Sequence, residues 1–146
     1  MYIVRRTTEE DLGNIVRLSE LWSSENITYG LAPNAISDLL PKLDGYFFVA
    51  DKDGQIVGYI FATTHVSEGT AVIPQGKKFL EIDEVYVHPD YRTDGIGHKL
   101  VDHLLDEARS YGITRSVVYS ASKQWDKIVG FYEKHGFKMW FVQMYK

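Results

Sequence analysis

Two glycines one residue apart, Gly95 and Gly97, stand where a strand-like segment gives way to an amphipathic one, within the run Arg-Thr-Asp-Gly-Ile-Gly of residues 92–97. Glycine lets the backbone turn tightly and approach a ligand closely. At the start of a helix several N–H groups point the same way, and the helix dipole adds positive potential there. The turn therefore predicts a site for a phosphate-bearing ligand, although a tight turn alone would also explain the two glycines.

Three carboxylates lie close together in the segment before this turn: Glu81, Asp83 and Glu84. Buried strands rarely carry three acids, so we expect at least one of them to line a wet cleft. Because side chains alternate along a strand, Glu81 and Asp83 should share one face and Glu84 the other, unless a β-bulge shifts the alternation. Solvent-facing or sheet-edge positions would explain the same acids without any chemistry.

The composition narrows the class of protein. A chain of 146 residues can bury a core and suits one domain, residues 1–146. It has no cysteine, which excludes a disulfide framework and a cysteine nucleophile. No metal is expected, because His98 and Asp102 share a helix face without a third ligand. With no membrane-length apolar run, no signal region and a net charge of −4, we expect a cytoplasmic protein without membrane or nucleic-acid partners.

Hydrophobic periodicity and turn residues predict the order of the elements. Six strands are expected, at residues 2–6, 46–50, 55–64, 79–87, 113–121 and 138–146. Four helices are expected, one after a Thr8–Asp11 capping box and others at residues 34–43, 96–108 and 126–135. The order β-α-α-β-β-β-α-β-α-β indicates an α+β fold, with antiparallel strands first and a βαβ crossover after them.

This order, the Arg-x-x-Gly-x-Gly turn and the run Phe-Tyr-Glu-Lys-His-Gly-Phe of residues 131–137 together resemble the GNAT N-acetyltransferase family, over essentially the whole chain. The resemblance implies a mixed sheet whose parallel strands, 79–87 and 113–121, splay apart around acetyl-coenzyme A. It implies direct transfer of the acetyl group to a primary amine, without an acyl-enzyme. The alternative is a catalytically degenerate member that binds acetyl-coenzyme A as a sensor or assembly subunit.

The same resemblance assigns the residues that contact the coenzyme. The pantetheine arm is expected to pair with the strand, at Val85, Tyr86 and Val87. The pyrophosphate is expected to meet the turn and the helix start, at Arg92, Thr93, Asp94, Gly95, Ile96, Gly97 and His98. The family often has a basic or small residue at the place of Asp94, and a role as helix N-cap would account for the carboxylate.

Amine acetylation needs a deprotonated amine, a stabilised oxyanion and an acid for the departing thiolate. Tyr132 matches the family tyrosine that serves as this acid; the alternative is a tyrosine that only fills the core. Glu81 falls where some members keep a general base, and we favour it over Glu84, which lies closer to the thioester. Either carboxylate can act through an ordered water.

The acceptor site is expected on the far side of the cleft from the coenzyme, next to the first helix. Residues 22–43 are expected to form the wall of the cleft on the acceptor side. The candidate contacts with the acceptor are Trp22, Glu25, Tyr29 and Asp38. A small amine, a polyamine, an aminoglycoside and a peptide amine all remain open. Only nine residues follow Phe137, too few for the hairpin that usually closes the family fold. The cleft is therefore expected to be open there or completed by a second subunit, as in a homodimer.

Overall fold

The computed structural model describes residues 1–146. Five strands form one sheet: β1 (Ile3–Arg6), β2 (Tyr46–Lys52), β3 (Gln55–Val66), β4 (Lys78–Val87) and β5 (Ser116–Val118). The α-helices are α1 (Leu12–Glu25), α2 (Ile36–Leu39), α3 (Ile96–Ser110) and α4 (Trp125–Glu133). Three 3-10 helices, η1 (Glu9–Asp11), η2 (Leu40–Asp44) and η3 (Pro89–Asp94), complete the set. The order agrees with the prediction through α4, and the predicted helix at 34–43 is divided between α2 and η2.

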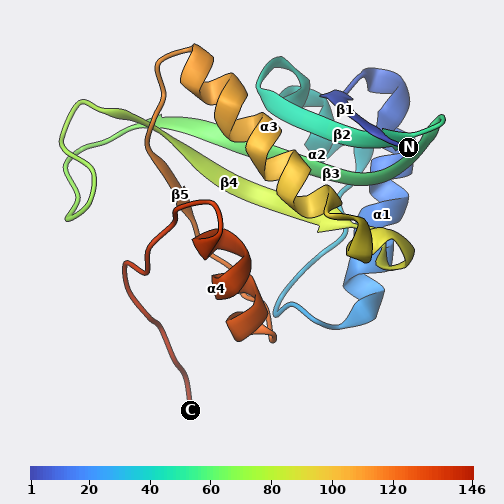
Figure 1. Ribbon diagram of the computed structural model, residues 1–146. Coiled ribbons are helices and arrows are strands. Elements are labelled where there is room, and N and C mark those ends of the chain that lie inside the picture. Colours follow the sequence, from blue (N-terminus) through green and yellow to red (C-terminus); the bar gives the residue numbers. More distant parts are fainter.

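The sheet has the order β1-β2-β3-β4-β5, antiparallel throughout except for the parallel pair β4 and β5. Helix α1 covers one face of it and α3 the other (Figure 1). The amphipathic segment after the glycines forms α3, whose apolar side chains are buried against the sheet: Ile96, Leu100, Val101, Leu104 and Ala108. The α+β fold class is thus confirmed, and α3 fixes the position of the glycine turn against the sheet.

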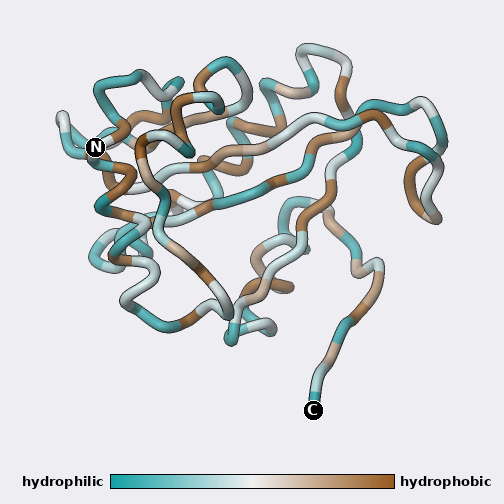
Figure 2. Tube along the Cα trace, turned by 180° about the vertical axis from the view of Figure 1, so that it is seen from behind, coloured by the Kyte–Doolittle hydropathy of each residue, from teal (hydrophilic) through white to brown (hydrophobic).

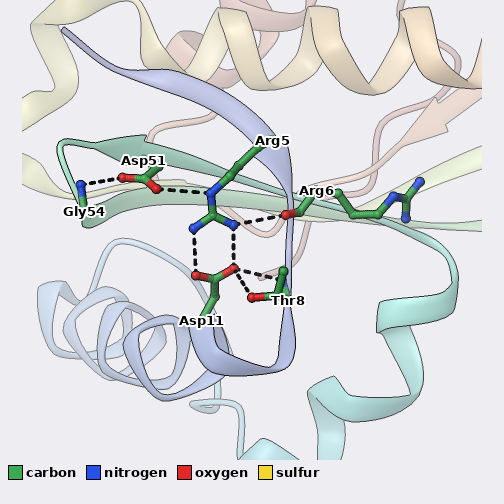
Figure 3. A network of polar contacts seen from close by, with 6 residues as sticks. All are labelled: Arg5, Arg6, Thr8, Asp11, Asp51 and Gly54. Atoms are coloured by element: carbon green, nitrogen blue, oxygen red, sulfur yellow. Dashed lines mark hydrogen bonds and ion pairs between the residues drawn. The ribbon is translucent and has the colours of Figure 1, made fainter.

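A polar network on β1 ties the start of α1 to the hairpin between β2 and β3 (Figure 3). Arg5 donates two hydrogen bonds to Asp11, at 2.8 and 2.9 Å, and a third to Asp51 at 3.1 Å. Asp11 also accepts from the backbone N–H of Thr8 at 2.8 Å, as the predicted capping box requires. Burial opposes the charged form of Asp11, but the hydrogen bonds from Arg5 and Thr8 hold its pKa below the usual range.

A β-bulge in β4 changes which way the three carboxylates face. Phe61 lies opposite Glu84 and Ala62 lies opposite Ile82, so Asp83 is the extra residue of β4. Ile82 packs in the core under α3, whereas Phe61 packs in the core under α1. The alternation predicted for a regular strand is therefore shifted, as expected if a bulge is present: the bulge brings Glu84 onto the same face as Glu81, on the α1 side.

The two parallel strands part soon after they meet. Strand β4 pairs with β5 only through Leu80–Ile82, although β4 continues to Val87. The predicted strand at 113–121 is correspondingly short, because β5 ends at Val118. The second half of β4 thus has no strand neighbour on this side, and its edge borders a cleft.

The strand predicted at residues 138–146 is absent. No backbone–backbone hydrogen bond involves these residues, and Figure 2 shows the segment extending away from the sheet to the C-terminus. Its large apolar side chains are exposed, among them Phe141 and Met144. The prediction rested on local composition, which is typical of a buried strand, but a strand also needs a partner, and nothing in the chain pairs with this segment. On this side of the sheet, β5 is the last strand.

Candidate active site

A cleft of about 330 Å³ opens where β4 and β5 separate. Its walls come from α1, the second half of β4, the glycine turn with the start of α3, the residues after β5, and α4. The cleft is lined by seven of the ten residues predicted to contact the coenzyme: Val85, Tyr86, Val87, Arg92, Gly95, Gly97 and His98. The side chains of Thr93 and Asp94 are exposed outside it, and that of Ile96 is buried in the core.

Gly95 is the N-cap of α3, and its φ of +73° lies in the left-handed region that favours glycine. A glycine has no side chain with which to cap the helix, so the first-turn N–H groups of α3 keep no side-chain partner. Asp94 was predicted as the N-cap, and this prediction is wrong because the helix begins one residue later. The open helix start is suited to an anionic group.

Gly97 serves a different purpose from Gly95. A Cβ atom at Gly97 would lie 3.2 Å from Cε1 of Phe131 and 3.8 Å from a methyl group of Val87. The absence of a side chain lets the first turn of α3 approach α4 closely. The two glycines therefore shape the turn separately, one through backbone conformation and one through packing.

The side chain of Arg92 is fixed by contacts with Glu25, the last residue of α1, and with the backbone of β4. It donates to both carboxylate oxygens of Glu25, at 2.8 and 2.5 Å, and to the carbonyl oxygen of Val87 at 3.0 Å. Glu25 also accepts from the hydroxyl of Tyr86, whose ring stacks on Trp22 with centroids 5.1 Å apart. Burial opposes the charge on Glu25, but Arg92 and Tyr86 hold its pKa below the usual range. The network fixes the end of α1 against the glycine turn.

Glu84 and Glu81 occupy different surroundings although they share a face. Glu84 lines the cleft and accepts hydrogen bonds from the hydroxyl of Tyr59 at 2.8 Å and from the amide of Asn34 at 3.0 Å. Burial raises the pKa of Glu84. Glu81 lies outside the cleft, 3.5 Å from a ring nitrogen of His65, and its pKa is raised by burial and by the neighbouring Asp83.

Tyr132 lines the cleft from α4 and is only 6% exposed. Its ring packs edge-on against Phe131 and Phe137, with centroids 5.0 and 5.4 Å away. The pKa of its hydroxyl is raised, with burial as the cause. Gly136 follows the helix in the left-handed conformation that favours glycine: its φ is +86°, and the N–H of Phe137 donates to the carbonyl oxygen of Tyr132 at 3.2 Å.

A family model described as an acetyltransferase (GNAT) domain matches residues 43–139. The chain belongs to the GNAT acetyltransferase family. The peptidyl-lysine N-acetyltransferase YjaB of Salmonella typhimurium is 29% identical to it over 148 residues, covering 95% of this chain and 85% of that protein. An uncharacterized N-acetyltransferase of Archaeoglobus fulgidus is 31% identical over 110 residues, 72% of each chain. The crystal structure of a predicted acetyltransferase with acetyl-CoA from Clostridium acetobutylicum has the same fold, with a TM-score of 0.74 at 20% identity over 99% of this chain and 96% of that one.

This GNAT protein is an acetyl-coenzyme A-dependent N-acetyltransferase. Its residues fit the coenzyme, which supplies the acetyl group as a thioester. The uncapped start of α3 would offer N–H donors to the pyrophosphate, and the unpaired edge of β4 would offer backbone groups to the amides of the pantetheine arm. No three His, Asp or Glu side chains of the acetyltransferase are grouped to hold a metal ion. None of its helices combines the length and apolarity needed to cross a membrane.

A short segment after α1 spans the gap between the two walls of the cleft. Thr28 forms an antiparallel bridge with Ser122, and backbone hydrogen bonds of 2.9 and 2.8 Å link Tyr29 to Ala121 and Lys123 to residue 27. Ile27 and Thr28 line the cleft. Sequence reasoning missed this contact, because nothing local in residues 26–29 indicates pairing with a segment about a hundred positions away.

The four residues predicted to contact the acceptor lie in different surroundings, and not all of them reach the cleft. Trp22 lines the cleft, whereas the carboxylate of Glu25 forms an ion pair with Arg92. Tyr29 is exposed, and its hydroxyl lies 3.1 Å from that of Tyr145. Asp38 accepts from the N–H of residue 35 at 2.8 Å and so caps α2. Of the four residues, Trp22 is the one that borders the cleft.

Proposed function

We propose that this acetyltransferase moves the acetyl group directly from the coenzyme to a primary amine that enters beside Glu84. One observation carries the proposal: Glu84 on β4 and Tyr132 on α4 line the same cleft, and the glycines of the turn line it as well. A base for the amine and an acid for the thiolate are the two groups that direct transfer requires. The chain has no cysteine, and direct transfer needs no acyl-enzyme.

Glu84, rather than Glu81, is the base in this proposal. Its carboxylate is held in place by Tyr59 and Asn34, and its burial raises the pKa and strengthens it as a base. It takes the proton of the ammonium group directly or through an ordered water. Glu81 lies outside the cleft, next to Asp83 and His65, and has no part in the reaction.

Tyr132 is the acid that protonates the departing thiolate. Burial raises its pKa, so the hydroxyl keeps its proton at neutral pH and can donate it. The rings of Phe131 and Phe137 hold the tyrosine ring at an edge-on angle on each side. This packing fixes the direction of the hydroxyl without consuming its hydrogen-bonding capacity.

The acceptor is a cationic amine. Asp83 and Glu84 supply negative charge to the cleft, and the stacked rings of Trp22 and Tyr86 supply aromatic surface beside it. An ammonium group is attracted by both features. Since a relative bears the name of a peptidyl-lysine acetyltransferase, the lysine side chain of a peptide stands beside small amines as a candidate.

The test is coenzyme A thiol release from acetyl-coenzyme A with a panel of acceptors: a lysine-containing peptide, free amino acids, a polyamine and an aminoglycoside. We expect release that depends on one class of amine, together with mass-spectrometric detection of the acetylated amine. Glu84→Gln should lower the rate and Glu81→Gln should leave it unchanged. Thiol release that is equal with and without every amine, or absent from all of them, would contradict the proposal.

A further inference from the structure

Beside the glycine turn, α3 and the end of α4 bring together three polar side chains that the proposed acid and base do not use. Nδ1 of His135 lies 3.1 Å from a carboxylate oxygen of Asp102. Nε2 of the same ring lies 2.8 Å from Nδ1 of His98. The side chain of His135 is 5% exposed, so the middle of this chain is shielded from water.

The contacts determine where the protons lie. The carboxylate of Asp102 lies 3.1 Å from Nδ1 of His135, and a carboxylate can only accept, so this contact favours the tautomer in which Nδ1 carries the proton. When both rings are neutral, Nε2 of His135 is an acceptor, Nδ1 of His98 is the donor, and Nε2 of His98 has a bare lone pair. When the pair gains one proton, Nε2 of His98 carries a hydrogen and becomes a donor. A single proton thus changes Nε2 of His98 from a hydrogen-bond acceptor to a donor.

That ring nitrogen belongs to a residue that lines the coenzyme cleft. His98 is the third residue of α3, next to the uncapped N–H groups, and its ring stacks on Phe131 with centroids 4.5 Å apart. Burial lowers the pKa of His98; His135 and Lys134 act in the same direction, and Asp102 opposes them. These groups, from α3 and from the end of α4, are the charged and titratable neighbours that act on the ring. Without an anion in the cleft, these groups together favour the neutral form of His98.

We propose that His98, positioned by Asp102 through His135, is a proton-switched contact for the coenzyme phosphates, so that coenzyme binding takes up a proton. The inference rests on the proposed use of this cleft for the coenzyme. A negative pyrophosphate favours the protonated pair, because the pair then presents a donor and a positive charge. Binding and protonation therefore strengthen each other, and affinity is greatest at low pH and falls as the pH rises.

The experiment is calorimetric titration with dephospho-coenzyme A between pH 5.5 and 8.5, in buffers of different ionisation enthalpy. This ligand lacks the 3′-phosphate, which itself titrates at a pKa of about 6. In the parent protein we expect uptake of up to one proton, and a loss of affinity that approaches tenfold per pH unit above the titration of the pair. His98→Gln keeps an N–H donor at all pH values, so its affinity should be nearly independent of pH.

Two further variants separate positioning from structure. Asp102→Asn removes the negative charge from an exposed carboxylate and should move the midpoint of the pH profile to lower pH, with the melting temperature almost unchanged. His103→Gln is the matched control on α3, because His103 packs against Phe48 away from the cleft, and it should keep the parent profile. The same pH profile in the parent and in His98→Gln would overturn the inference. A parent protein that binds no coenzyme at any pH would instead overturn the proposed function.

Discussion

The close approach of α3 to α4 at Gly97 predicts that alanine is harmful there, although alanine favours helices. In a helix, glycine to alanine gains about 1 kcal/mol from backbone entropy. At Gly97 the new Cβ would lie 3.2 and 3.4 Å from two carbons of the Phe131 ring, closer than packed atoms normally approach. Overpacking costs about 1–3 kcal/mol. The two effects leave a net loss of about 1 kcal/mol, or roughly 3 °C in the melting temperature of a chain of this size.

Gly13 provides the matched control, because it is the second residue of α1, as Gly97 is of α3, and a Cβ there would meet nothing within 4 Å. Thermal unfolding should show Gly13→Ala to be stabilising and Gly97→Ala to be destabilising. Phe131→Leu shortens the opposing side chain, so it should recover part of the loss when combined with Gly97→Ala. If Gly97→Ala stabilises the protein as much as Gly13→Ala does, the packing argument is refuted.

Three further predictions concern the site and the network on β1. Tyr132→Phe keeps the ring, so turnover should fall roughly a hundredfold or more while melting temperature and coenzyme affinity stay near the parent values; full activity would remove the hydroxyl from the mechanism. Because burial raises the pKa of Glu84, the acid limb of the rate profile should lie above the usual glutamate range and should vanish in Glu84→Gln but persist in Glu81→Gln. The pKa of Asp11 is lowered on folding, so Asp11 contributes stability above its unfolded pKa of about 3.9, and this is lost as the pH falls through the folded value. Asp11→Asn should therefore cost ~2 kcal/mol at pH 7 and much less in strong acid, and an equal cost at both would contradict this linkage.

Local patterns predicted the elements whose shape depends on nearby residues. The amphipathic pattern of residues 96–108 indicates α3 from spacing within a few turns. The capping box at Thr8 is equally local. The order of the elements and the family motifs then placed most of the expected coenzyme contacts around the end of β4 that borders the cleft.

Features that depend on distant partners were not predictable in this way. The bulge at Asp83 is defined by the register of β4 against β3, and it alone decides that Glu84 shares a face with Glu81. The bridge from Thr28 to Ser122 and the contact of His98 with His135 likewise join segments far apart in the chain. The segment 138–146 shows the converse: its composition favours a strand, but a strand forms only where a partner edge lies beside it.

A crystal structure with coenzyme A would locate the ligand in the cleft without relying on a rate. We expect the pyrophosphate at the first-turn N–H groups of α3 and the pantetheine arm along the unpaired edge of β4. The sulfur should lie within hydrogen-bonding distance of the Tyr132 hydroxyl, on the same side as Glu84. A coenzyme bound elsewhere, or one whose sulfur lies far from Tyr132, would contradict this arrangement.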